Sequence, residues 1–115
     1  MSSKNRSYVY ILSNHSKAIY IGVTSDLQRR VWQHRYGSGG IHTSRFNISR
    51  LVWFEESDDI RIAIAREKQI INGRRDWKDA LIVKTNPAWK DIAEDWFDSF
   101  DTLNQVQGDV LNIKG

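Results

Sequence analysis

The stretch SYVYILSNHSKAIYIGV, residues 7–23, decides the fold class that this sequence predicts. Its two ends, residues 7–13 and 18–23, alternate between two sets of side chains with a period of two, which is typical of β-strands. The four residues between them, Asn-His-Ser-Lys, form turns readily and make a short connection. The stretch therefore predicts an antiparallel hairpin on which Tyr10 and Tyr20 are near neighbours.

Apolar spacing and capping residues predict the remaining elements. Ser25 followed three residues later by Gln28 is a capping-box pattern, which indicates the start of a helix. The expected elements are a helix over residues 26–35, a strand over 51–54, helices over 59–72 and 75–84, and a last amphipathic helix after Pro87 that carries Trp89, Ile92, Ala93 and Trp96. This order predicts an α/β fold of the α+β type, in which a small central antiparallel three-stranded sheet is flanked by helices.

Length and composition indicate one domain. A chain of 115 residues suits one hydrophobic core, so we expect a folded domain over residues 1–96 and a loosely ordered acidic tail over residues 97–115. The sequence has no cysteine, which excludes disulfides, thiolate catalysis and cysteine-ligated metal sites. No apolar run approaches the roughly 20 residues that span a bilayer. We therefore expect a cytoplasmic protein with no membrane segment and no obligate protein partner.

Positive charge is concentrated in the first half of the chain. Residues 1–50 contain eight lysines and arginines and one acid, a net charge of +7, whereas residues 91–115 contain six acids and one lysine, a net charge of −5. A basic segment of this kind attracts polyanions such as nucleic acids. A solvated basic surface is the plainer interpretation wherever nothing else indicates phosphate binding.

One carboxylate stands out in the helix expected over residues 59–72. At about 100° per residue, Glu67 projects into the middle of the apolar arc of that helix. The arc consists of Ile60, Ala63, Ile64, Ile70 and Ile71. A carboxylate in such a place needs a partner, because burial of an unpaired charge costs several kcal/mol. Two interpretations are open, an internal ion pair with an arginine or coordination of a metal ion.

Two further features point to phosphate chemistry, each weakly when taken alone. Arg30 and His34 are four residues apart, so on a helix they share a face and can reach one ligand, and a guanidinium donates paired hydrogen bonds to phosphate. Such a pair is also common on a solvated helix face. Gly22 in mid-strand indicates a bulge or a place where a ligand approaches the backbone. The three histidines are dispersed, which argues against a zinc site.

Taken together, these residues form a known pattern. Tyr-Ile-Gly at residues 20–22 matches the second half of a two-part motif, and Tyr-Val-Tyr at residues 8–10 stands where its first half is expected. Arg30 follows Tyr20 by ten residues, and His34 lies one helical turn beyond Arg30. The sequence therefore resembles the GIY-YIG endonuclease superfamily over residues 7–96, and it is most similar to the small stand-alone bacterial branch.

The resemblance implies a divalent-metal-dependent endonuclease that hydrolyses phosphodiester bonds in DNA with low sequence specificity, with a preference for structured or single-stranded DNA. Its implied roles are catalysis by Tyr10, Tyr20, Arg30 and His34, binding of Mg²⁺ or Mn²⁺ by Glu67, and substrate positioning by Gly22 and Asn86. Arg29, Arg35 and Arg45 lie near this set and are expected to contact phosphates. The sequence departs from the motif at Tyr8, which replaces its first glycine.

Two other classes of function stay open. The main alternative is a non-catalytic nucleic-acid-binding or adaptor module with the same fold, and the presence of all five key side chains argues against it. The other is a structural protein that assembles through its tryptophans. Core packing is the more favoured interpretation for Trp53, Trp77, Trp89 and Trp96. DNA repair, recombination and defence are all compatible pathways.

Overall fold

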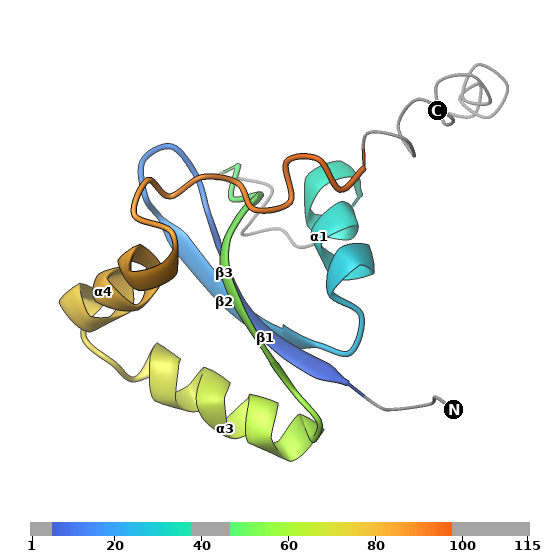
Figure 1. Cartoon of the computed structure of the whole chain (residues 1–115), viewed down its shortest axis with the longest axis vertical. Coiled ribbons are helices and arrows are strands. Elements are labelled where there is room, and N and C mark those ends of the chain that lie inside the picture. Colours follow the sequence, from blue (N-terminus) through green and yellow to red (C-terminus); the bar gives the residue numbers. More distant parts are fainter. Residues whose placement is uncertain (1–5, 38–46, 98–115) are drawn as a thin grey trace, which may run out of the picture.

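The computed structural model describes residues 6–37 and 47–97, which build one antiparallel sheet with helices on both of its faces (Figure 1). The strands are β1 (Ser7–Ser13), β2 (Ile19–Thr24) and β3 (Arg50–Ser57), and the helices are α1 (Leu27–Tyr36), α3 (Ile60–Ile71) and α4 (Arg75–Thr85). The sheet has the order β2-β1-β3, and both pairings are antiparallel. The predicted α+β class with a three-stranded antiparallel sheet is therefore confirmed.

β1 is the central strand and is buried on both faces. Tyr10 and Leu12 belong to one core cluster, whereas Val9 and Ile11 belong to another. Successive residues of a strand point to opposite faces, so each cluster takes every second residue of β1. Val31 of α1 packs in the cluster of Tyr10, and Figure 1 shows α1 on one face of the sheet with α3 and α4 on the other. Tyr10 therefore lies on the α1 face.

Aspartate side chains begin two of the helices. Asp26 accepts a hydrogen bond from the backbone N of Arg29 at the start of α1, and Asp59 accepts one from the backbone N of Arg61 at the start of α3. Such caps satisfy amide groups that have no partner inside the helix. The observed bounds of α1, α3 and α4 differ from the predicted ones by at most one residue, whereas β3 extends three residues beyond its prediction.

α3 buries a narrower face than its apolar residues predicted. Ala63 and Ile70 are buried, and the half-buried Glu67 lies on the same face between them. The prediction of a wide apolar arc was wrong at three positions, because a helix that crosses a three-stranded sheet meets it along one stripe. The three exposed members of that arc are Ile60, Ile64 and Ile71.

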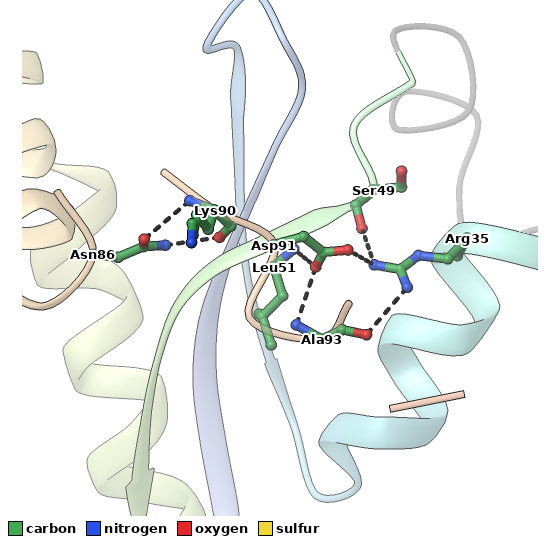
Figure 2. Close-up of polar contacts among 7 residues, drawn as sticks. All are labelled: Arg35, Ser49, Leu51, Asn86, Lys90, Asp91 and Ala93. Carbon is green, nitrogen blue, oxygen red and sulfur yellow. Dashed lines mark hydrogen bonds and ion pairs between the residues drawn. The ribbon is translucent and has the colours of Figure 1, made fainter. Parts of the chain in front are cut away.

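Residues 86–97 form a series of turns, so the prediction of a last amphipathic helix was wrong. Trp89 has a φ of 54°, a left-handed conformation that interrupts a helix. The segment is attached to β3 instead. The backbone N of Ile92 donates to the carbonyl of Leu51 at 2.8 Å. The carboxylate of Asp91 accepts from the backbone N of Leu51 at 3.1 Å, as Figure 2 shows. In Figure 1 this segment runs from the end of α4 across to α1.

Three smaller predictions have different outcomes. Trp53 and Trp89 are core residues as predicted, Trp96 is half-buried against the core, and Trp77 is 39% exposed on α4. No helix in the part of the chain that the structure describes is long and apolar enough to cross a membrane. The predicted acidic tail falls outside the described residues from residue 98 onward.

Candidate active site

Four side chains from three elements meet between α1 and the hairpin. Tyr10 on β1, Tyr20 on β2 and His34 on α1 form a cluster of rings, with centroid distances of 6.3 Å between the tyrosines and 6.0 Å and 5.3 Å from His34 to Tyr10 and Tyr20. Arg30 precedes His34 by one helical turn, and its positive charge acts on both Tyr10 and His34. The structure thus brings together the four residues to which the motif assigned catalysis.

Tyr10 is held in place by the glycine opposite it. Tyr10 pairs with Gly22 across the two strands and is 1% exposed. A Cβ atom at Gly22 would lie 2.5 Å from the Tyr10 hydroxyl oxygen and 2.6 Å from its Cζ, so any side chain at this position would collide with the ring. The expectation of a bulge at Gly22 was wrong, because the pairing of β1 and β2 is regular through this position, and the expected approach of a ligand to its backbone stays a prediction. Gly22 can act on a substrate through Tyr10.

The hydroxyl of Tyr10 and the imidazole of His34 form a buried neutral pair. The hydroxyl oxygen lies 3.2 Å from Nε2 of His34. Burial raises the pKa of Tyr10 from 10.0 to about 12. Burial, and then the positive charge of Arg30, lower the pKa of His34 from 6.5 to about 4. In the tautomer that carries its proton on Nδ1, His34 accepts a hydrogen bond from the phenol.

Arg30 supplies the positive charge of the cluster. Its interaction with the Tyr10 hydroxyl raises the pKa of Arg30 above its ordinary value, so the guanidinium is charged at any working pH. Nη1 of Arg30 also donates to Oε1 of Gln33 at 3.0 Å. The sequence prediction missed Gln33, although its i, i+3 spacing from Arg30 on a helix was a usable signal.

The Arg30 side of the cluster opens into a surface pocket of about 310 Å³. The pocket is lined by Val23, Thr24, Ser25, Asp26, Arg29, Arg30 and Gln33. Arg29 is exposed there, as a phosphate-contacting residue would have to be. The carboxylate of Asp26 caps α1 by accepting from the backbone N of Arg29 at 3.2 Å, so it is engaged at the pocket's edge. Two guanidinium groups therefore share one open pocket, which is named the phosphate pocket after the ligand that is proposed for it below.

Glu67 acts on the same cluster from α3. Its negative charge contributes to the raised pKa of Tyr10. Within the described residues the carboxylate of Glu67 forms no hydrogen bond or ion pair, and the neighbouring Arg66 pairs with Glu55 at 3.2 Å. The internal ion pair that the sequence left open is therefore not formed in that part of the chain. A single half-buried carboxylate is a donor that fits Mg²⁺, because this ion retains several of its waters.

Asn86 has a structural role, and its assignment to substrate positioning stays a prediction. Its side chain is 8% exposed, and Nδ2 donates to the carbonyls of Val52 at 3.1 Å and Lys90 at 2.8 Å. Oδ1 accepts from the backbone N of Lys90 at 3.0 Å, as the left part of Figure 2 shows. The side-chain amide is therefore occupied by backbone groups, and it fixes the turn after α4 against β3.

Arg35 is likewise engaged in the fold, and its role as a nucleic-acid contact stays a prediction. Its Nη2 pairs with Asp91 at 2.7 Å and donates to the carbonyl of Ser49 at 3.2 Å (Figure 2). These bonds connect α1 to the segment after α4 and to the start of β3. Arg45, the third predicted contact, lies outside the described residues.

The depressed pKa of His34 predicts an acid-sensitive fold. The unfolded chain takes up a proton at His34 below pH 6.5, whereas the folded chain resists it down to about pH 4, so stability is lost as pH falls through this window. We expect His34 to account for about 2 kcal/mol of that loss. Urea unfolding at several pH values checks this, because His34→Gln should flatten the slope of unfolding free energy against pH. The exposed His15 is the matched control, and an equal flattening by His15→Gln would contradict the prediction.

Comparison with known proteins identifies relatives of the chain. A family model described as the GIY-YIG catalytic domain matches residues 6–80. A UPF0213 protein from Haloquadratum walsbyi is 36% identical over 74 residues, which cover 64% of this chain and 83% of that protein. A UPF0213 protein from Clostridium perfringens is 36% identical over 76 residues, covering 66% and 82%. The names of these relatives state no activity.

One solved structure is similar over most of its length. The solution NMR structure of the UPF0213 protein BH0048 from Bacillus halodurans matches with a TM-score of 0.50 and 25% sequence identity. The match covers 78% of this chain and 97% of that one. The likeness therefore extends over nearly the whole of a small domain.

Proposed function

Because this chain belongs to the GIY-YIG family, we propose that it is a divalent-metal-dependent endonuclease that hydrolyses phosphodiester bonds in DNA with low sequence specificity. The observation that carries the proposal is the placement of Arg30, a permanent cation, beside two tyrosines and a neutral histidine at the edge of the phosphate pocket. A phosphodiester is a substrate that uses all of these groups at once, since it needs charge stabilisation and a path for one proton.

Arg30 and Tyr20 are the groups that would contact the phosphate and the attacking water. Arg30 lines the open pocket, and Tyr20 is half-buried, whereas Tyr10 is almost fully enclosed. A guanidinium donates two hydrogen bonds to phosphate oxygens and offsets the charge that develops on them. Tyr20 would then hold the water that forms the new bond to phosphorus as the bond to the leaving oxygen breaks.

Tyr10 and His34 would take the proton of that water. A phenol with a pKa of about 12 is a poor base alone, but it can pass a proton to a neutral imidazole that already contacts its hydroxyl. The imidazole is weakly basic in the free protein partly because of the positive charge of Arg30. A phosphate bound to Arg30 neutralises this charge, so substrate binding makes His34 a stronger base.

Glu67 would hold the divalent ion, Mg²⁺ or Mn²⁺. Bound there, the ion would offset negative charge on the phosphate and on the leaving oxygen.

Glu67→Gln should weaken Mn²⁺ binding at least about tenfold, because the neutral amide is a poorer ligand for a hard cation. Water-proton relaxation in the presence of Mn²⁺ measures this without any turnover. Glu94→Gln changes an exposed carboxylate in the same way and is the control, which should leave Mn²⁺ binding unchanged. Equal binding by wild type and Glu67→Gln would remove Glu67 from the proposal.

The function itself is tested by a substrate panel. Purified protein is incubated with single-stranded, duplex, flapped and branched DNA, and with RNA, in Mg²⁺, in Mn²⁺ and in chelator. The proposal requires cleavage of DNA that depends on the metal and varies little with sequence. Binding without cleavage of any member would support the adaptor class instead, and cleavage in excess chelator would contradict the metal requirement.

A further inference from the structure

A groove lined by aromatic side chains adjoins the phosphate pocket, and the proposed reaction gives it no role. It has a volume of about 410 Å³ and is formed by the outer side of α1 and by the end of the segment after α4. Its lining residues are Asp26, Gln28, Arg29, Trp32, Trp96 and Phe97. Trp32 and Trp96 are both half-buried, so each shows part of its indole to solvent. We call this the aromatic groove.

The rings of the groove belong to a continuous series of aromatic contacts. Trp96 contacts Phe97 with ring centroids 6.2 Å apart, Phe97 contacts Tyr36 at 6.3 Å, and Tyr36 contacts Trp32 at 5.6 Å. On the other side, Trp96 contacts Phe54 of β3 at 6.3 Å. The rings therefore support one another and present a firm surface, which is what stacking of a flat ligand requires.

The aromatic groove and the phosphate pocket share two residues, Asp26 and Arg29. Arg29 and Arg30 are successive residues of α1, so they point in different directions around the helix, Arg30 toward the tyrosine cluster and Arg29 toward the shared edge. A ligand that spans both hollows must therefore carry negative charge at Arg30 and Arg29 and a flat apolar group beyond Arg29.

We propose that the aromatic groove binds one unpaired nucleobase of a single-stranded segment, while the backbone of the same strand runs over Arg29 to the phosphate at Arg30. A nucleotide chain has the required sequence of groups, an anionic phosphate followed by a flat ring. Bases inside a duplex are stacked on their own neighbours, so the groove favours single-stranded over fully paired DNA. The inference rests on the proposed function for its phosphate position, and it names the substrate class of that site.

The groove predicts recognition of bases without strong sequence preference. Every base has a flat face that stacks on an aromatic ring, and the polar side chains that line the groove are Asp26, Gln28 and Arg29. Stacking of one base contributes roughly fivefold to 100-fold in affinity. This tolerance agrees with a small domain that cleaves with low specificity.

Binding in chelator tests the inference without cleavage. Fluorescence anisotropy compares a labelled single-stranded DNA with a strand of equal length whose nucleotides are all abasic, so that charge is kept and the bases are removed. We expect the abasic strand, and a duplex of the same sequence, to bind roughly fivefold to 100-fold more weakly. Equal affinity for the base-bearing and abasic strands would overturn the proposal, and so would tighter binding of the duplex.

Two protein variants locate the effect. Trp96→Leu should weaken binding of the base-bearing strand toward the abasic level and leave the abasic affinity unchanged, whereas Trp77→Leu on α4 should change neither. If both variants retain the full preference for bases, the groove is not the subsite. The strand comparison uses wild-type protein, so it decides whether unpaired bases contribute to binding even if Trp96→Leu folds poorly, and Trp32→Leu then tests the groove from α1. Base-dependent binding without any cleavage would support the groove while refuting the nuclease proposal, so the two failures are distinguishable.

Discussion

Replacement of Arg30 by alanine is expected to lower the rate of DNA cleavage by about a thousandfold or more, with the fold unchanged. The guanidinium lines the phosphate pocket and carries the charge that would offset the developing negative charge on the phosphate. Its side chain interacts with Gln33 on the same helix and with the hydroxyl of Tyr10, so its loss should cost about 1 kcal/mol and leave the fold intact. Single-turnover cleavage and thermal unfolding of the same preparation check the two halves of this prediction.

The matched controls separate charge, geometry and general basicity. Arg74→Ala removes an exposed arginine that pairs loosely with Asp76 at 3.7 Å, and it should leave the rate within about twofold. Arg30→Lys keeps the charge but loses the planar fork, so it should recover part of the rate. A second readout is the His34 imidazole, whose pKa should rise in Arg30→Ala because the positive charge that lowers it is gone. A rate near wild type in Arg30→Ala would remove Arg30 from the proposed mechanism.

The hairpin and the first helix could be predicted because their signals are local. Alternation over residues 7–13 determines which side chains share a face, and the spacing within α1 places Arg30 and His34 one turn apart. A short connection then brings Tyr10 and Tyr20 together without information from the rest of the chain. Four members of the candidate site lie within these 28 residues, 7–34, and the structure brings those four together.

The parts that could not be predicted depend on partners far away in the sequence. Nothing near Asn86 indicates that its amide faces the carbonyl of Val52, 34 residues earlier, and nothing near Arg35 indicates Asp91, 56 residues later. The prediction of a helix after residue 87 was wrong for the same reason, because distant partners hold this segment. Apolar residues at helical spacing indicate that their side chains reach the core, but they do not determine the backbone conformation. Here the hydrogen bonds of Asp91 and Ile92 to β3 determine the path of the backbone.

The second large effect is expected at Gly22, a residue with no side chain. Gly22→Ala places a methyl group 2.5 Å from the hydroxyl oxygen of Tyr10, so the ring must move. Because Tyr10 is 1% exposed and enclosed by the core, that movement should cost about 1–3 kcal/mol of stability. It should also separate the hydroxyl from His34, and a displacement of about 1 Å is sufficient to lower a rate about 100-fold. Urea unfolding and single-turnover cleavage measure the two losses.

A double-mutant cycle distinguishes this collision from a general intolerance of Gly22 to substitution. Tyr10→Leu removes the ring that lies over Gly22, so in that background Gly22→Ala should cost less than about 0.5 kcal/mol of unfolding free energy. If the cost stays the same with and without the ring, the glycine is needed for the backbone and not for Tyr10. Strong coupling would mean instead that the glycine of the Tyr-Ile-Gly motif serves to hold Tyr10 against His34. Gly22 would then affect catalysis without ever touching the substrate.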